Sequence, residues 1–249
     1  MKASLAPIVM LFSTALAAPT LVPEGVSFPI TDLIESDLTV EEYAHQLEGE
    51  RVVAPVLAKR QYSGTTYNQL TDGTACRPIS VIYARGTTQA GNVGDVGSEG
   101  PTFLNAIAAR VGGASRVAVQ GVNYPADVFG FLAGGSAEGA TTMFNLIGQT
   151  ATRCPSTKIV VSGYSQGAQL VHTATQRLTS ANAARVSAVV TFGDADRDES
   201  FGLVAASKIL IICHEGDNIC DNGIIITPEH RNYEIDAPRA ADFVAARVA

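Results

Sequence analysis

Five short apolar runs recur along the chain between residues 79 and 213, and each is continuous rather than alternating with polar residues. Uninterrupted runs rich in valine and isoleucine are typical of strands that are buried on both faces of a parallel sheet. The runs predict strands at Ile79–Tyr83, Val117–Val119, Ile159–Val161, Ala188–Phe192 and Ile209–Cys213.

Helical patterns fall between or after these runs, and two of them begin at a proline, which suits the first turn of a helix. The predicted helices are Pro101–Arg110, Thr141–Thr152, Gln166–Leu178 and Pro238–Val248. Strands that alternate with helices indicate an α/β fold with a mostly parallel sheet covered by helices on both faces. Ligands of such folds bind at the carboxyl ends of the strands.

The N-terminus has the pattern of a secretory signal. Lys2 precedes an apolar run, Leu5–Leu16, which is too short to span a bilayer. Small residues around Ala17 and Ala18 form cleavage contexts, so residues 1–18 are predicted to be a signal peptide. No later apolar stretch is long enough for a membrane helix, and we therefore expect a secreted, extracellular product.

Residues 19–60 differ from the rest of the chain because they are acidic, lack cysteine and end in the basic pair Lys59-Arg60. A basic pair after an acidic spacer in a secreted protein indicates a processing site, although a solvated pair in a linker has the same composition. We predict a propeptide at 19–60 and a mature catalytic domain at 61–249, beginning at Gln61.

Composition favours one globular domain that acts on uncharged material. The 249 residues are 46% hydrophobic and 16% charged, with a net charge of −7 that argues against a nucleic-acid partner. Residues 1–60 hold 8 of the 24 acids and 4 of the 17 bases, so residues 61–249 carry 16 acids and 13 bases, a net charge of −3. We expect the mature protein to be a monomer.

All four cysteines lie in the predicted mature domain. An even number in a secreted chain indicates disulfides, and four cysteines allow three pairings. Because Cys213 and Cys220 are close in sequence, we expect Cys213–Cys220 and Cys76–Cys154. A zinc site is disfavoured, since the spacing contains no C-x-x-C pair.

The pentapeptide Gly163-Tyr164-Ser165-Gln166-Gly167 joins a predicted strand to a predicted helix. A serine between two glycines at such a turn matches the nucleophile elbow G-x-S-x-G, which exposes the hydroxyl at the sheet edge. A plain strand–helix turn that needs glycine for its dihedral angles has the same pattern, so the pentapeptide alone does not decide.

A serine nucleophile needs a histidine base. Two of the four histidines are disfavoured as the base. His45 lies in the predicted propeptide, and His172 lies about 10 Å from Ser165 along the same helix, which is out of reach. Elbow enzymes place the acid between serine and histidine in the chain, which favours His230 as the base. His214 stays open with an acid from the cluster Asp194, Asp196 and Asp198.

The proposed Cys213–Cys220 disulfide narrows the choice of the acidic residue that supports the histidine. Asp217 lies inside the loop that a Cys213–Cys220 bridge would close, and a restrained carboxylate can orient an imidazole. The acidic cluster from Asp194 to Glu199 is instead interpreted as a solvated turn.

Oxyanion donors are expected at two places. The backbone N–H after the nucleophile belongs to Gln166, and the glycine-rich loop after the first strand offers Thr87. The alternative for this loop, a phosphate-binding turn, is disfavoured because the loop lacks the P-loop lysine.

These stretches together resemble the cutinase family of secreted serine esterases. The matching motifs are PSTKIVVSGYSQG at 155–167, CHEGDNIC at 213–220 and ARGTT at 84–88, and the similarity covers about residues 74–248. Two departures are present: members often have glutamate in place of Gln89, and the residue before the histidine, often proline, is Glu229 after Pro228.

The resemblance implies a small α/β-hydrolase fold, a three-layer sandwich around a five-stranded, mostly parallel sheet, with no metal and no cofactor. It implies the triad Ser165, Asp217 and His230, and the same two disulfides. It also implies Thr87 and Gln166 at the oxyanion hole, and an open site without a lid.

Two apolar stretches are expected to flank Ser165 and to bind substrate. Their candidate residues are Phe129, Phe131, Leu132, Ile224, Ile225 and Ile226. Exposed apolar rims favour an insoluble aliphatic polyester, cutin, together with short-chain soluble esters. An acetyl xylan esterase and a catalytically idle surface-binding or elicitor protein are the alternatives.

Overall fold

The structure, a computed structural model, describes residues 25–48 and 61–249. Its centre is a five-stranded sheet with the strand order β3-β2-β4-β5-β6, and every neighbouring pair is parallel. All five predicted strands are confirmed, with the bounds β2 Ile79–Ala84, β3 Val117–Gly121, β4 Lys158–Tyr164, β5 Val186–Phe192 and β6 Ile209–Ile212. The predicted signal peptide and the Lys59-Arg60 pair lie outside the described residues.

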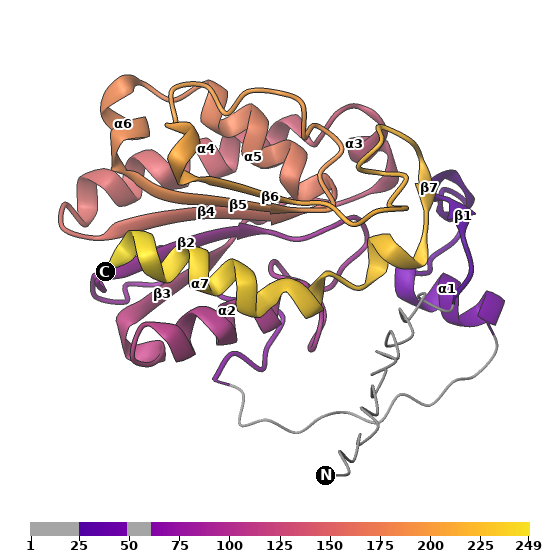
Figure 1. Ribbon diagram of the computed structural model, residues 1–249, viewed down its shortest axis with the longest axis horizontal. Coiled ribbons are helices and arrows are strands. Elements are labelled where there is room, and N and C mark those ends of the chain that lie inside the picture. Colours follow the sequence, from indigo (N-terminus) through magenta and orange to yellow (C-terminus); the bar gives the residue numbers. More distant parts are fainter. Residues whose placement is uncertain (1–24, 49–60) are drawn as a thin grey trace, which may run out of the picture.

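Helices cover both faces of this sheet, which makes the predicted three-layer sandwich (Figure 1). One face carries α2 (Glu99–Arg110) and α7 (Ala237–Val248), and the other carries α4 (Ala137–Arg153), α5 (Gln166–Gln176) and α6 (Ser180–Arg185). Each face has its own apolar core, because the strand side chains alternate between the two helical layers. The chain therefore folds as a small α/β hydrolase.

Several short elements were not predicted, because they are too short to show a hydrophobic period. They are β1 (Phe28–Pro29), β7 (Ile225–Ile226), α1 (Val40–Glu48), α3 (Val128–Leu132), α6 (Ser180–Arg185) and the 3₁₀ helices η1 (Ile30–Leu33), η2 (Ala114–Arg116), η3 (Ala206–Lys208), η4 (Pro228–Arg231) and η5 (Tyr233–Asp236). Strands β1 and β7 pair antiparallel in a second small sheet.

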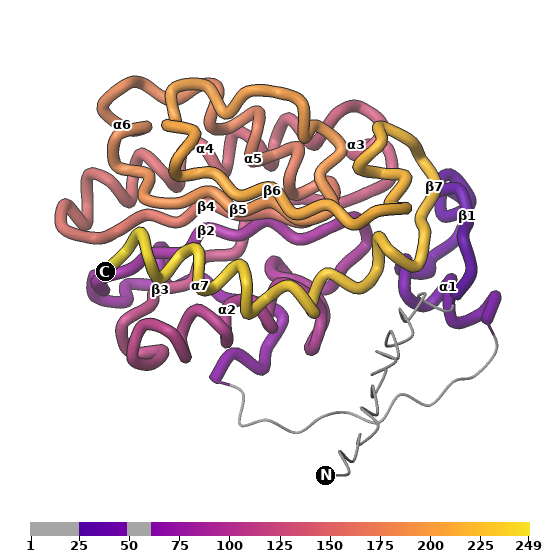
Figure 2. Tube along the Cα trace, in the orientation of Figure 1, coloured from indigo at the N-terminus to yellow at the C-terminus, as the bar shows by residue number. Residues whose placement is uncertain are grey.

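Residues 25–48, called the covering segment below, pack against the loops at one end of the main sheet (Figure 2). They add β1 to β7 and place α1 beside this end of the molecule. Their apolar side chains share a third core with Val128, Phe131 and Ile226. A segment read from the sequence as an acidic spacer is thus joined to the folded domain.

Both expected disulfides are present. Cys76–Cys154 ties the chain before β2 to the end of α4, and Cys213–Cys220 closes the loop after β6. Within residues 25–48 and 61–249, no helix has the length and hydropathy to cross a membrane. The same residues contain no cluster of three or more metal-ligating side chains.

Candidate active site

Ser165 stands on a sharp turn between the end of β4 and the start of α5. Its backbone has φ 55° and ψ −122°, a strained conformation for a residue other than glycine. A Cβ at Gly163 would overlap the carbonyl of Gly167, and a Cβ at Gly167 would overlap the carbonyl of Ala84. Both flanking glycines are therefore required by close backbone packing, and the strain is that of a nucleophile elbow.

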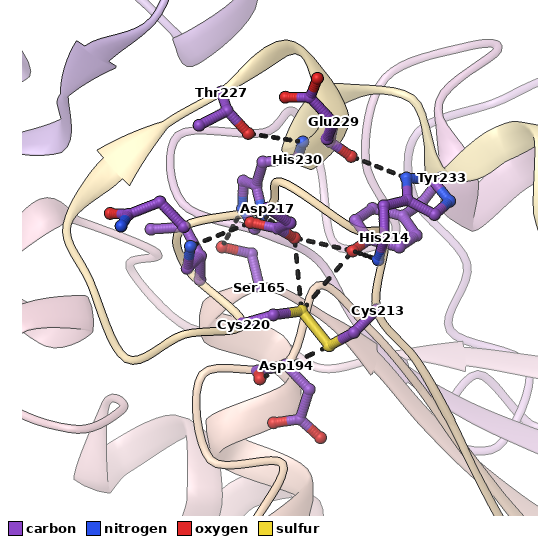
Figure 3. Close-up of polar contacts among 12 residues, drawn as sticks. Ser165, Asp194, Cys213, His214, Asp217, Cys220, Thr227, Glu229, His230 and Tyr233 are labelled. Carbon is purple, nitrogen blue, oxygen red and sulfur yellow. Dashed lines mark hydrogen bonds and ion pairs between the residues drawn. A yellow bond between two sulfur atoms is a disulfide. The ribbon is translucent and has the colours of Figure 1, made fainter. Parts of the chain in front are cut away.

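His230 links Ser165 to Asp217 (Figure 3). The Ser165 Oγ lies 3.0 Å from His230 Nε2, and His230 Nδ1 lies 2.9 Å and 3.0 Å from the two Asp217 carboxylate oxygens. Since a carboxylate only accepts hydrogen bonds, Nδ1 carries the proton and Nε2 is left free to accept one from Ser165. The structure thus brings together three residues that are far apart in sequence, in the arrangement of a catalytic triad.

Asp217 is buried and is fully supplied with donors. Besides His230 it accepts a hydrogen bond of 2.9 Å from the Ile219 backbone N–H and one of 2.7 Å from the Tyr233 hydroxyl. Burial raises the pKa of Asp217, but the hydrogen bonds and charge of His230 and the hydrogen bond from Tyr233 lower it below its ordinary value. The carboxylate therefore stays ionised beside the imidazole.

The His230 ring is held from several sides. Thr227 caps η4 by accepting the His230 backbone N–H, and the Tyr164 hydroxyl donates to the His230 carbonyl at 2.8 Å. The Tyr164 ring stacks on the imidazole with centroids 5.1 Å apart. Gly193 has a φ of 55° and leaves room for the ring edge, since a Cβ there would lie 2.8 Å from His230 Cε1.

Thr87 and Gln166, the expected oxyanion donors, lie in contact with one another. The Gln166 side-chain amide donates to Thr87 Oγ1 at 2.9 Å, which leaves the Thr87 hydroxyl proton free to point elsewhere. Gln166 is also the first residue of α5, where a backbone N–H has no acceptor within the helix. The Gln166 backbone N–H and the Thr87 hydroxyl thus both lie at the turn that carries Ser165.

Two other histidines, His172 and His214, are committed to different partners, while His45 is exposed on α1. His172 lies on α5 and pairs with Asp194 at 2.9 Å. His214 contacts the Glu229 carbonyl at 2.8 Å and the Asp236 carboxylate. Neither bonds Ser165, so the alternative triad through His214 is not what the structure forms.

The interpretation of the acidic cluster after β5 as a solvated turn is wrong for its first member. Asp194 is fully buried against His172, whereas Asp198 and Glu199 are exposed. The pairing depends on packing between β5 and α5, which the local sequence does not reveal. Tyr233 and Tyr164 were also missed as residues of the site, and apart from their closeness to His230 and Ser165 in sequence no signal marks them.

The cutinase family model matches residues 75–248. This chain belongs to the cutinase family. It is 51% identical over 199 residues to cutinase CUT2 of Pyricularia oryzae, covering 78% of this chain and 91% of the relative. It is 46% identical over 173 residues to the cutinase of Botryotinia fuckeliana, covering 70% of this chain and 84% of the relative.

Solved structures agree with this assignment. The Trichoderma reesei cutinase bound to a phosphonate inhibitor aligns with a TM-score of 0.69 and 40% identity, covering 75% of this chain and 81% of that chain. An acetylxylan esterase aligns with a TM-score of 0.58 and 24% identity, covering 70% of this chain and 100% of that chain, a likeness that shows the fold alone. This member of the cutinase family is a serine esterase, a carboxylic ester hydrolase.

The predicted apolar rim divides into exposed and buried residues. Phe129 is 65% exposed, and Leu132 and Ile224 are also exposed. Phe131 and Ile226 are instead buried in the core shared with the covering segment, and Ile225 is half-buried. Burial of Ile226 follows from the pairing of β7 with β1, which the sequence did not predict.

The expectation of an open site without a lid is not met in this structure. Ser165 is only 3% exposed, and the cavity beside it has a volume of about 10 Å³, which is the space for about one water molecule. Ile30 and Val40 of the covering segment line this cavity together with Ser165 and His230. An ester substrate cannot enter while these side chains are in place.

Two hydrogen bonds and an ion pair hold the covering segment over the cavity beside Ser165. The Ile30 N–H donates to the Ile224 carbonyl, and the Val40 N–H donates to Thr88 Oγ1, each at 2.8 Å. A partly buried ion pair joins Arg231 to Glu48 at 2.6 Å. Thr88 and Arg231 each directly follow a candidate site residue, so the covering segment is bonded to side chains that adjoin the site.

Proposed function

We propose that this chain hydrolyses the ester bonds of cutin, an insoluble aliphatic polyester, and of small soluble esters, with Ser165 as nucleophile. The observation that carries the proposal is the hydrogen-bond chain from Ser165 through His230 to Asp217. Its geometry supports nucleophilic catalysis through an acyl-enzyme without any metal or cofactor.

In this mechanism Ser165 Oγ attacks the ester carbonyl carbon while His230 Nε2 takes the hydroxyl proton. The carbon–oxygen bond to the alcohol then breaks, and His230 returns the proton to the leaving alcohol. Water then attacks the acyl carbon while the same nitrogen takes one of its protons. The ester bond to Ser165 Oγ breaks, the acid leaves, and His230 returns the proton to Ser165. The Gln166 N–H and Thr87 would stabilise the oxyanion, each contributing roughly 3–4 kcal/mol to the transition state.

Substitution of the nucleophile tests this assignment directly. We expect Ser165→Ala to abolish hydrolysis of p-nitrophenyl butyrate while the circular dichroism spectrum stays unchanged. Covalent labelling of the wild type by an organophosphate, located by mass spectrometry on Ser165, tests the alternative of an idle surface-binding protein. A folded Ser165→Ala variant that keeps substantial activity, or a wild type that is never labelled even after residues 19–60 are removed, would refute the mechanism.

The exposed apolar residues support an aliphatic substrate. Phe129, Leu132 and Ile224 would lie against polymer chains, and exposed rims of this kind usually mark an interaction surface. Acetylated xylan, the substrate named for one structural relative, is polar and would gain little from them. Rates on cutin, p-nitrophenyl esters of increasing length and acetylated xylan separate the two substrates, and a strong preference for acetylated xylan would reverse our choice.

The remaining assignments concern maturation. Residues 1–18 would direct secretion, and residues 19–60 would leave after cleavage behind Lys59-Arg60, giving an extracellular monomer of residues 61–249. The small cavity beside Ser165 and the contacts of Ile30 and Val40 support a further step, in which the unprocessed chain is a latent zymogen.

Latency can be tested on the unprocessed chain. We expect purified chain with residues 19–60 retained to hydrolyse esters slowly, and cleavage behind Arg60 followed by removal of the segment to raise the rate. N-terminal sequencing of the secreted protein, with allowance for cyclised glutamine, should give Gln61. Equal activity before and after cleavage would show that the cover opens freely, and a start at Ala18 or Pro19 would show that the segment stays.

A further inference from the structure

Tyr233 makes a contact with Asp217 that the triad alone does not require. Its hydroxyl donates to Asp217 Oδ2 at 2.7 Å, on the carboxylate oxygen that also faces His230 Nδ1 at 2.9 Å (Figure 3). We propose that Tyr233 is a positioning residue, which fixes the Asp217 carboxylate so that it orients His230. The proposal rests on the function proposed above.

The direction of this hydrogen bond is set by a second neighbour. The His214 backbone N–H donates to the Tyr233 hydroxyl oxygen at 2.9 Å. A hydroxyl has a single proton, and an oxygen that already faces an N–H must accept from it, so the proton is directed to Asp217. Burial and the Asp217 charge raise the pKa of Tyr233, which keeps this proton on the hydroxyl.

The ring is held as firmly as its hydroxyl. Tyr233 is fully buried, and its ring stacks on His214 with centroids 4.0 Å apart and an angle of 13° between the planes. His214 is itself bonded at both ring nitrogens, by the Glu229 carbonyl and by Asp236. The histidine that was the rival base thus acts as a support for Tyr233.

The support of Asp217 is divided between its two oxygens. The Ile219 N–H holds Oδ1 at 2.9 Å, and Tyr233 holds Oδ2. The Cys220 sulfur also lies 3.4 Å from Oδ2. Without the Tyr233 hydroxyl the carboxylate could tilt about the Ile219 contact, and its unshared charge would attract a proton to His230 more strongly.

Other groups face this pair and must be kept constant in any test. His230 also contacts Ser165 and Tyr164, and Glu41 of α1 lines the same cavity. The charged Arg231 follows His230 and is bound by Glu48 and Glu41. Beyond Tyr233, the ionisable groups around His214 are Asp236 and Glu234. Tyr233→Phe leaves these side chains in place and keeps the aromatic ring, although the His214 backbone N–H also loses its acceptor.

The test compares Tyr233→Phe with Tyr62→Phe as a matched control. Tyr62 is also a buried tyrosine, but its hydroxyl donates to the Val117 carbonyl, away from the triad. All forms are measured in the same processing state, by kcat and KM on p-nitrophenyl butyrate against pH. In addition, the low-field Nδ1 proton of His230, assigned by its loss in His230→Gln, is followed by NMR on the full chain.

For Tyr233→Phe we expect kcat to fall about tenfold with KM unchanged, as for the loss of one hydrogen bond to a charged group. The acid limb of kcat/KM and the protonation of His230 seen by NMR should both move to higher pH by about half a unit. Tyr62→Phe should lose stability without either effect.

Two outcomes would overturn the proposal. One is a folded Tyr233→Phe variant whose kcat and acid limb match the wild type. The other is an equal change in Tyr62→Phe, which would make the role of Tyr233 purely structural. If Tyr233→Phe did not fold, NMR on the wild type would still test the proposal. Rapid exchange of the Tyr233 hydroxyl proton with water would show that the hydroxyl does not donate to Asp217. The NMR readouts do not depend on Ser165, so a failure of the proposed function would be seen separately.

Discussion

Glu48 and Arg231 are 183 residues apart in sequence, yet their side chains form an ion pair with an N–O distance of 2.6 Å. Arg231 directly follows His230, while Glu48 ends the helix of the covering segment. Both side chains are mostly shielded from water, so the pair is less screened than a surface salt bridge. The contact binds the segment that covers Ser165 to the loop that carries His230, the proposed base.

Weakening the ion pair between Glu48 and Arg231 should release the covering segment from Ser165. In a background where Lys59→Gln and Arg60→Gln prevent cleavage, we expect Glu48→Gln to raise esterase activity about fivefold, since about 1 kcal/mol favouring the closed form would be lost. Activity on p-nitrophenyl butyrate measures the change. Glu35→Gln, an exposed acid of the same segment, is the control and should change nothing. Equal activity in both variants would mean that the ion pair does not hold the cover.

The rate should rise with pH as His230 loses its proton, because only the neutral ring accepts a proton from Ser165. Asp217 stays ionised while His230 loses its proton, because His230 and Tyr233 lower the pKa of Asp217 despite its burial. His230→Gln should remove the pH-dependent limb and nearly all activity. His214→Gln should retain the limb and most of the activity, because His214 does not contact Ser165 and reaches the triad only through Tyr233. A reversed result would reassign the base.

Glu99 should make stability fall as pH rises. Burial raises the pKa of Glu99 to about 8, although Gln89 donates to it at 2.6 Å. Between about pH 4.5 and 8 the folded chain therefore keeps this proton, while the unfolded chain releases it. Because the folded chain binds more protons in this window, its stability falls as pH increases. The loss across this window is of the order of a few kcal/mol.

Glu99→Gln removes this titration but keeps an oxygen for Gln89 to bond. We expect the variant to lose less stability than the wild type between pH 5 and pH 8, as measured by urea unfolding with the disulfides intact. Glu138→Gln removes an exposed acid and should leave the wild-type pH dependence unchanged. Parallel curves for the wild type and Glu99→Gln would show that Glu99 is ionised in the folded protein.

Breaking the small disulfide should impair catalysis beyond its effect on stability. Cys220 lies three residues after Asp217, with its sulfur 3.4 Å from the carboxylate. We expect Cys213→Ser/Cys220→Ser to lose about 2–3 kcal/mol of stability. At a temperature where it remains folded, its turnover should fall roughly tenfold, or about 1.4 kcal/mol in the barrier.

The other disulfide provides the matched control. Cys76→Ser/Cys154→Ser opens a longer loop, with a sequence separation of 78, and should cost more stability, about 4–5 kcal/mol. Its turnover in the folded state should stay near that of the wild type, because the bridge lies away from the triad. Assays at low temperature beside circular dichroism separate the two effects, and a folded Cys213→Ser/Cys220→Ser variant with normal turnover would make that bridge purely structural.

The sheet and its nucleophile turn were predictable because their signals are local. Continuous apolar runs such as Ile159–Val161 can be buried on two faces only inside a covered parallel sheet, and all five strands lie where these runs predict. Gly163 and Gly167 likewise mark Ser165 because no larger residue fits that turn. The chain order of serine, acid and histidine then reduced the choice of base and acid to a few residues.

The tertiary structure alone decided which distant groups meet. The burial of Asp194 with His172, the contact of Tyr233 with Asp217 and the docking of β1 on β7 each join segments whose own sequences show no sign of the partner. Such contacts arise from how helices and loops pack on the sheet, and packing depends on the whole core at once rather than on any local period. For the same reason an acidic, weakly patterned segment could be identified from the sequence, while its position over Ser165 could not.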